Sequence, residues 1–157
     1  MTQSDTSNSM IFATTVEELQ ARLDASPFNA WLGLRITNIG PEFVHFSVQG
    51  RPEFIGTRRL GRMHGGVLTA LIDAAAGYTL MARVGISITS VDIRVDFHQS
   101  ANIEDLNIQG AVVKLGRKLA CVDVRVLNTE NALIASGRGT FYIPAIPSTT
   151  NTLSTES

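Results

Sequence analysis

Apolar and polar residues alternate along segment 87–98 of the chain. The apolar positions in this segment are Val91, Ile93, Val95 and Phe97, and the residues between them are charged or polar. A period of two with one polar face predicts a strand of an antiparallel sheet that has solvent on one side. On this alternation Ser90 falls on the polar face of the strand.

Five more segments have the composition of strands, and turn residues separate several of them. The segments are 34–39, 42–49, 106–115, 119–127 and 132–143. The pairs Gly40-Pro41 and Gly116-Arg117 mark two of the turns. Long segments joined by tight turns predict an antiparallel sheet, since parallel strands need longer connections.

Two segments have the pattern of helices. Thr15 and Glu18 form a capping box that begins a short helix running to about residue 25. Segment 66–83 is apolar almost all round, which predicts a long buried helix, and its polar interruptions leave it short of a transmembrane span. Because one helix must serve the whole sheet, we expect an α+β fold in which the sheet curls around the helix. Small residues on one face of the last strand would let this helix pack close, namely Ala135, Gly137 and Gly139.

The chain of 157 residues suits a single domain, which we place at residues 11–143. The ends at 1–10 and 144–157 are rich in Ser, Thr, Asn and Pro and are predicted to be disordered. A net charge of -1 offers no basic field to nucleic acid, and no apolar stretch of a signal peptide is visible. The lone Cys121 has no partner for an internal disulfide, so we expect a cytoplasmic protein with neither nucleic-acid nor membrane partners.

Asp73 is the only charged residue between His64 and Arg83. Aspartate is a poor residue for a helix interior, and a buried carboxylate is costly unless it is paired or hydrogen-bonded. A residue that suits neither the helix nor the core points to a functional role. The alternative is structural, in which Asp73 satisfies a backbone group or pairs with a buried arginine.

The long helix is expected to begin at His64-Gly65-Gly66. Helix N-termini present free N–H groups, and glycine lets a substrate approach them, so this site would stabilise an oxyanion on a carbonyl. The alternative is that the glycines only shape the entry to the helix. Gly65 and Asp73 are separated by roughly 12 Å along a helix, so one carbonyl cannot touch both. A dyad of His64 and Asp73 fails for the same reason, and if Gly65 and Asp73 both act they come from two chains of a symmetric dimer.

These residues resemble the signature of the PaaI-type hotdog thioesterases, in which a His-Gly-Gly motif precedes an aspartate after six intervening residues, as at His64 and Asp73. The resemblance extends over about residues 15–143. Further matches are segment 89–97, the turn at Gly116-Arg117, and the upstream residues Phe28 and Leu32-Gly33-Leu34.

The resemblance implies a hotdog fold, with an antiparallel sheet wrapped around one long central helix. It implies an enzyme that hydrolyses an acyl-CoA thioester to the free acid and CoA at the interface of a homodimer, often paired into a homotetramer. The Gly65 N–H would polarise the carbonyl, and Asp73 of the other chain would attack as nucleophile or activate water as general base. His64 belongs to the same motif, and Ser90 matches a position that orients the attacking water in some relatives. No metal and no cofactor are expected beyond the coenzyme A of the substrate.

Two positions depart from that family. An Asn or Gln often lies six or seven residues before the His, where this chain has Arg58 and Thr57. Arg58 would either pair with Asp73 and weaken it as a base, or bind the phosphates of CoA. The other candidates for substrate binding are Gly66, Arg59, Arg62, Arg117 and Lys118. The acyl pocket is expected near Leu68, Ile72, Tyr78 and Met81.

Two other functions stay open on the sequence. One is a non-catalytic hotdog protein that binds acyl-CoA or a related ligand, which Arg58 in place of Asn favours slightly. The other is a hotdog dehydratase or hydratase, which needs a histidine with a carboxylate in a different helix context. The glycine pair at the helix start fits a thioesterase better than a dehydratase or hydratase.

Overall fold

The structure, a computed structural model, describes residues 13–145. The end predicted to be disordered at 1–10 lies outside the described residues, as does the end at 144–157 apart from residues 144 and 145. The helices are α1 (Val16–Asp24), α2 (Pro27–Leu32) and α3 (Gly65–Val84), with a 3-10 turn η1 (Pro52–Phe54). The strands are β1 (Arg35–Ile39), β2 (Val44–Val48), β3 (Ile55–Thr57), β4 (Arg62–Met63), β5 (Thr89–Phe97), β6 (Leu106–Leu115), β7 (Leu119–Leu127) and β8 (Leu133–Tyr142).

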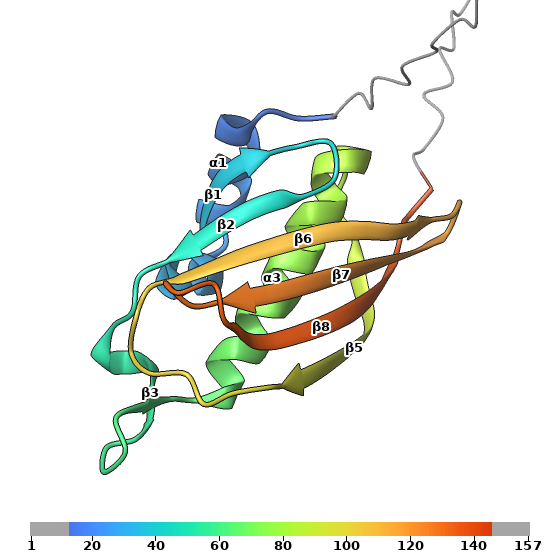
Figure 1. The fold of residues 1–157 in the computed structure, drawn as a ribbon. Coiled ribbons are helices and arrows are strands. Elements are labelled where there is room, and N and C mark those ends of the chain that lie inside the picture. Colours follow the sequence, from blue (N-terminus) through green and yellow to red (C-terminus); the bar gives the residue numbers. More distant parts are fainter. Residues whose placement is uncertain (1–12, 146–157) are drawn as a thin grey trace, which may run out of the picture.

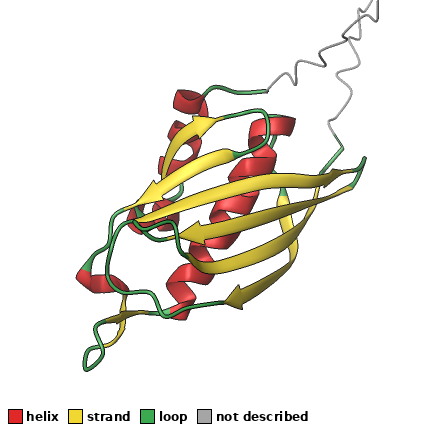
Figure 2. Ribbon diagram, in the orientation of Figure 1, coloured by secondary structure: helices red, strands yellow, loops and turns green. Residues whose placement is uncertain are grey.

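Six of the strands form one antiparallel sheet in the order β1-β2-β6-β7-β8-β5, and β3 and β4 form a separate hairpin. The sheet curves around α3, and α1 packs beside β1 (Figure 1). Figure 2 shows the same two layers, with all three helices behind the strands. The predicted α+β architecture, a sheet wrapped around one long helix, is therefore confirmed.

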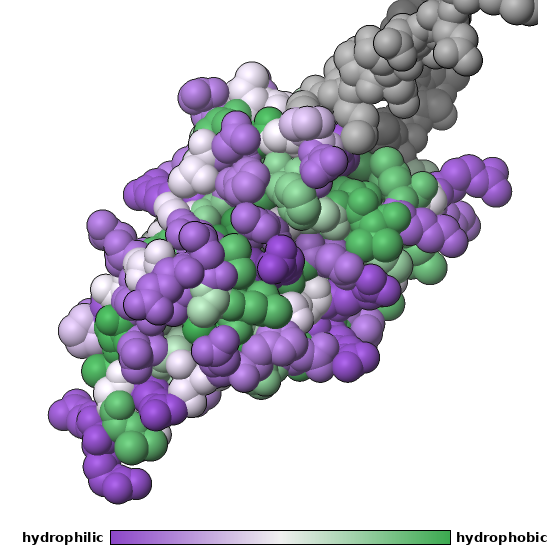
Figure 3. All heavy atoms as spheres, in the orientation of Figure 1, coloured by the Kyte–Doolittle hydropathy of each residue, from purple (hydrophilic) through white to green (hydrophobic). Residues whose placement is uncertain are grey.

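The outer face of the sheet carries most of its charged side chains, as the alternation along segment 87–98 predicts. Asp123 of β7 accepts two hydrogen bonds from Arg138 of β8, and Arg94 of β5 pairs with Asp96 two residues further on. Figure 3 shows this face, where hydrophilic side chains surround smaller apolar areas. All of these pairs are exposed, and each contributes little to stability.

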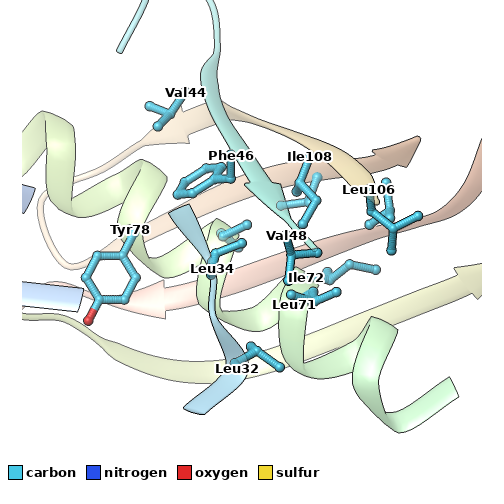
Figure 4. Packing of buried hydrophobic residues seen from close by; sticks show 14 of the residues in the cluster. Leu32, Leu34, Val44, Phe46, Val48, Leu71, Ile72, Tyr78, Leu106 and Ile108 are labelled. Atoms are coloured by element: carbon cyan, nitrogen blue, oxygen red, sulfur yellow. The ribbon is translucent and has the colours of Figure 1, made fainter. Parts of the chain in front are cut away.

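Helix α3 is the centre of the core. Half of its 20 residues are buried, and its C-terminus is closed by Gly85, whose φ of 72° is a conformation that glycine adopts freely. The side chains around Ile72 pack against Val48, Phe46 and Ile108 from the sheet (Figure 4). By length and composition α3 is long and apolar enough to cross a bilayer, so the prediction that it falls short of a membrane span is wrong by that measure. Most of its apolar stretch is buried inside the fold, which is typical of a core helix.

The small residues of β8 allow α3 to lie close to the sheet, as the sequence predicts. A Cβ atom added to Gly137 would lie 2.5 Å from Cγ2 of Ile72, and one added to Gly139 would lie 3.5 Å from Cβ of Ala76. Both neighbours belong to α3. Gly137 therefore lets Ile72 of α3 approach closer than any larger residue would, and Gly139 is in ordinary contact distance of the helix.

The variant Gly137→Ala is expected to lower the free energy of unfolding by about 1–3 kcal/mol, the usual cost of overpacking a core. The added Cβ would lie 2.7 Å from the carbonyl oxygen of Arg94, and backbone cannot move aside as a side chain can. Gly77→Ala is the matched control on α3, where the methyl group meets nothing closer than 3.7 Å. That control is expected to gain up to about 1 kcal/mol from helix propensity. Urea unfolding followed by circular dichroism measures both, and equal effects of the two variants would contradict the close packing.

A β-bulge in β5 changes the face on which Ser90 lies. The register against β8 shifts after Ser90, which lies opposite Phe141, while Ile93 lies opposite Gly139. Phe141 and Gly139 are on the helix side of β8, so Ser90 faces α3, and the extra residue Val91 is 60% exposed. The prediction that Ser90 lies on the polar face is wrong, because a bulge breaks the alternation at this point.

Two local elements differ from the sequence prediction. After α1 the chain forms α2, which starts with Pro27, a residue favoured in the first turn of a helix, and ends at Gly33 with a φ of 74°. The loop expected at 51–66 contains η1 and the β3–β4 hairpin. Strands of two or three residues are too short to show a period, so the sequence gives no signal for this hairpin.

Candidate active site

Asp73 lies on α3 and faces the edge strand β5. Its carboxylate oxygen Oδ1 accepts a hydrogen bond of 3.1 Å from the hydroxyl of Ser90. The Asp73 side chain is half-buried rather than buried, because β5 is the last strand of the sheet and the flank beside it is open. The sequence correctly predicts a buried helix here, but the carboxylate itself reaches a groove.

This groove lies between α3 and β5 and has a volume of about 390 Å³. Thr69, Ala70 and Asp73 line it from α3, Ile93 lines it from β5, and Phe28 of α2 lines it as well. Within it Asp73 and Asp92 supply negative charge, and none of its lining residues is basic. The groove therefore combines one hydrogen-bonded carboxylate with mostly apolar walls.

The start of α3 forms a second concave site. The imidazole Nδ1 of His64 accepts a hydrogen bond of 2.8 Å from the Gly66 N–H, so His64 caps the helix. Within residues 13–145 the Gly65 N–H meets no acceptor, which is usual for a first-turn donor. The Phe97 ring lies beside Gly65, since a Cβ on that glycine would be 3.3 Å from Cζ of Phe97. An adjoining cavity of about 390 Å³ is lined by Gly65, Phe97 and the polar residue Arg62, among others.

Gly65 and Asp73 do not meet within one chain. Both lie on the continuous helix α3, so eight residues separate them by roughly 12 Å, and the same separation keeps His64 from Asp73. The structure brings Ser90 to Asp73, and it brings Phe97 to Gly65. One chain therefore carries two half-sites at opposite ends of β5.

The candidate residues for binding CoA fall into two groups at opposite ends of the sheet, and all of them but Thr57 are cations. Thr57, Arg58, Arg59 and Arg62 lie on or beside the β3–β4 hairpin, which projects from the fold and where all four are exposed (Figure 1). Arg117 and Lys118 lie in the exposed turn between β6 and β7. Among the hydrogen bonds and ion pairs of the described residues, Asp73 bonds to Ser90 and Arg58 does not reach it. A pair between Arg58 and Asp73 within one chain is therefore not formed.

The acyl pocket is expected near four residues, and the core fills the space around Ile72 and Tyr78. Leu68 lines the cavity at the start of α3, and Met81 is partly buried against the core. Ile72 and Tyr78 are at most 9% exposed and pack with the sheet (Figure 4). The open groove lies on another flank of α3. Phe28, which in the sequence is only a match to the family, is one of the groove residues that sequence reasoning does not assign to the site. An exposed aromatic beside a helix-initiating proline is a weak signal in a sequence, because exposure is visible only in the fold.

Within the described residues no group of three or more His, Cys, Asp or Glu residues is arranged to hold a metal ion. Metal-independent action stays a prediction. What the arrangement offers chemically is a hydrogen-bonded carboxylate in one groove and a free helix N–H in another, which together would serve attack on a carbonyl and stabilisation of the resulting oxyanion.

This chain is similar to known proteins in both sequence and fold. A family model described as the thioesterase superfamily matches residues 60–135. A crystal structure of a protein from the thioesterase superfamily is 32% identical, with a TM-score of 0.79, and the match covers 82% of this chain and 98% of that one. The medium/long-chain acyl-CoA thioesterase YigI of Escherichia coli is 26% identical over 135 residues, which are 74% of this chain and 85% of YigI. A mutant of the phenylacetic acid degradation protein PaaI from Thermus thermophilus gives a TM-score of 0.68 at 25% identity, covering 76% and 100% of the two chains.

The wrapped central helix and these matches define a hotdog-fold enzyme that hydrolyses thioesters. The chain belongs to the thioesterase superfamily, and it is a thioesterase of the PaaI type. The fold, family and enzyme class predicted from the sequence are confirmed.

Proposed function

We propose that this thioesterase hydrolyses acyl-CoA as a homodimer, with Asp73 of one chain and Gly65 of the other completing each site. The observation that carries the proposal is the hydrogen bond of 3.1 Å that holds the Asp73 carboxylate toward an open groove. The similarity to YigI, whose name specifies medium/long-chain acyl-CoA, supports the choice of substrate.

The edge strand β5 supports a dimer. Its outer edge has no partner strand among the described residues, and such an edge pairs readily with another strand. Antiparallel pairing of β5 with β5 of a second copy would place the Phe97 end of one strand beside the Ser90 end of the other. Because Gly65 lies beside Phe97 and Asp73 beside Ser90, this symmetry joins the two half-sites.

The same pairing explains how the separated cations would act together. The β6–β7 turn lies at the Thr89 end of β5, because Leu119 pairs with Tyr142 and Tyr142 pairs with Thr89. The β3–β4 hairpin precedes α3 and lies at the other end. In the dimer Arg117 and Lys118 of one chain would approach the arginine-bearing hairpin of its partner, and these cations would bind the phosphates of CoA.

The chemistry follows from the groups at the site. The Gly65 N–H donates to the thioester carbonyl oxygen and stabilises the oxyanion that forms on attack. Asp73 either attacks the carbonyl carbon, giving an acyl anhydride that water hydrolyses, or removes a proton from water that attacks in its place. Ser90 orients Asp73 through its hydrogen bond. In both routes the C–S bond breaks, and CoA leaves as a thiolate that takes up a proton.

The experiment that tests this function measures release of free thiol from a panel of acetyl-, hexanoyl-, decanoyl- and phenylacetyl-CoA by the purified full chain. We expect turnover of at least one thioester, unchanged by a metal chelator, from a protein whose mass in solution is that of a dimer or larger. A folded protein that binds acyl-CoA without releasing thiol would instead establish a non-catalytic binder.

A further inference from the structure

Phe28 is an exposed aromatic residue at the side of the Asp73 groove. Its side chain is 57% exposed, although burying a phenylalanine is favourable by about 1.5–3 kcal/mol. It lines the groove together with Ala70, Asp73 and Ile93. An apolar ring left in solvent beside a reactive carboxylate suggests that a ligand covers it during the reaction.

The short helix α2 holds Phe28 in a fixed place. Asn29 donates a hydrogen bond of 3.3 Å to the hydroxyl of Tyr78 on α3, and that hydroxyl donates to the carbonyl of Arg22. At the other end Arg51 donates to the backbone carbonyl of Trp31. A helix anchored at both ends presents its exposed ring in one position, as a wall of a binding site requires.

The Arg51 guanidinium adds to this anchor. It lies 4.8 Å from the ring centre of Trp31 and 4.4 Å from that of Phe54, so two aromatic faces contact one cation. The rings of Trp31 and Phe28 are stacked with centres 6.0 Å apart. The Phe28 ring is therefore held by its stacking on Trp31 while it lines the groove and stays largely exposed.

The two concave sites differ in chemical character. Phe28, Ala70 and Ile93 give the Asp73 groove mostly apolar walls, whereas Arg62, Gln99 and Ser100 make the cavity at the start of α3 the more polar of the two. An acyl-CoA has the same asymmetry about its reacting carbon, with a hydrocarbon on one side and amides and phosphates on the other. The hydrocarbon of the acyl group matches the apolar groove, and the amides and phosphates of CoA match the more polar cavity and its arginine. This match fixes the direction in which the substrate lies.

We propose that the acyl group of the substrate lies in the groove against the Phe28 ring, and that Phe28 determines which acyl groups are hydrolysed. This inference rests on the proposed function and names the orientation of the substrate at that site. The substrate class it implies is an acyl group with an apolar chain or ring long enough to pass Asp73 and reach α2. Short acyl groups end before they reach Phe28 and gain no binding energy from contact with its ring.

The test compares wild type, Phe28→Ala and Phe28→Trp on acetyl-, hexanoyl-, decanoyl- and phenylacetyl-CoA. Phe28→Ala is expected to lower kcat/KM by about 10- to 100-fold for the three larger acyl groups, the range expected for lost apolar pocket contacts, and by no more than about threefold for acetyl-CoA. Phe28→Trp is expected to shift preference toward shorter chains. Val113→Ala, an exposed apolar residue on β6, is the control and should change no ratio between substrates.

Three results would overturn the inference. The first is an equal loss on all four substrates, and the second is no change with any of them. The third is a change in the solution mass of Phe28→Ala, since Phe28 would then be a contact between copies of this chain. Circular dichroism and the melting temperature confirm folding, and Phe28→Trp and Phe28→Leu keep the comparison valid if the alanine variant does not fold. If wild type releases no thiol from any substrate, the proposed function fails, which is distinct from a wild-type enzyme whose preferences ignore Phe28.

Discussion

Replacing Asp73 with Asn is expected to lower kcat for thioester hydrolysis by about 100- to 10,000-fold without disturbing the fold. The amide has the shape of the carboxylate and its oxygen can still accept the hydrogen bond from Ser90. It is neither a nucleophile nor a base, so both proposed roles of Asp73 are lost at once. Thiol release at saturating acyl-CoA, with circular dichroism to confirm folding, measures the effect.

Asp92→Asn is the matched control for Asp73→Asn, because Asp92 lines the same groove and also carries a carboxylate. It is exposed and should alter kcat by no more than about threefold. A single turnover in water labelled with heavy oxygen tests the nucleophilic role: label in the Asp73 carboxylate requires an acyl anhydride on Asp73 that water opens at the Asp73 carbonyl, whereas general-base catalysis leaves Asp73 unlabelled. Full activity of Asp73→Asn would refute either role.

Gly65→Pro is expected to lower kcat by about 100- to 1,000-fold, the usual effect of removing one oxyanion donor. Proline has no N–H, so this change deletes the proposed donor at a position where the helix tolerates proline. Gly65 is the first residue of α3, where proline is favoured, and the preceding His64 has the extended backbone (ψ 132°) that a following proline requires.

Gly65→Ala is the control for the added bulk at this position. Its Cβ meets the edge of the Phe97 ring at 3.3 Å, as a proline Cβ also would, but it keeps the N–H. It should therefore retain most of the activity. If Gly65→Ala and Gly65→Pro lose activity equally, contact with Phe97 rather than loss of the N–H explains the result.

The same two positions test whether each site spans two chains. A mixed dimer of Gly65→Pro and Asp73→Asn contains one site with both changes and one site with neither. Random assembly of equal amounts would therefore restore about a quarter of wild-type activity. Activity that stays at the level of the single variants would show that Gly65 and Asp73 do not complete one site across two chains.

The sequence predicts much of this fold because its strong patterns are local. The capping box at Thr15 begins α1, the all-apolar run becomes α3, and the strands β6 and β7 have the predicted bounds. The glycines of β8 predict close packing against α3, because a residue without a side chain lets the helix approach the backbone of the strand. These signals depend on neighbouring residues and need no knowledge of distant contacts.

The site was predicted less completely because its geometry depends on irregularities and on the edge of the sheet. The bulge after Ser90 reverses the face of one residue, and strict alternation cannot reveal it. Asp73 is half-exposed because β5 is an edge strand, which is a property of strand order rather than of composition. Phe28 reaches the groove only because α2 folds back against α3 through the contact between Asn29 and Tyr78.

The groove wall and the catalytic groups belong to two different helices, α2 and α3, and this division affects which mutations the enzyme tolerates. The carboxylate and the helix N–H belong to α3, whose other faces pack against the sheet. Substitutions on α3 are therefore expected to destabilise the fold. The groove wall belongs to a helix of six residues that is attached by a few side-chain contacts at its ends. Substitutions at Phe28 can therefore alter selectivity while the catalytic apparatus stays intact, and this short helix is the natural place for divergence between relatives and for directed evolution of new acyl preferences.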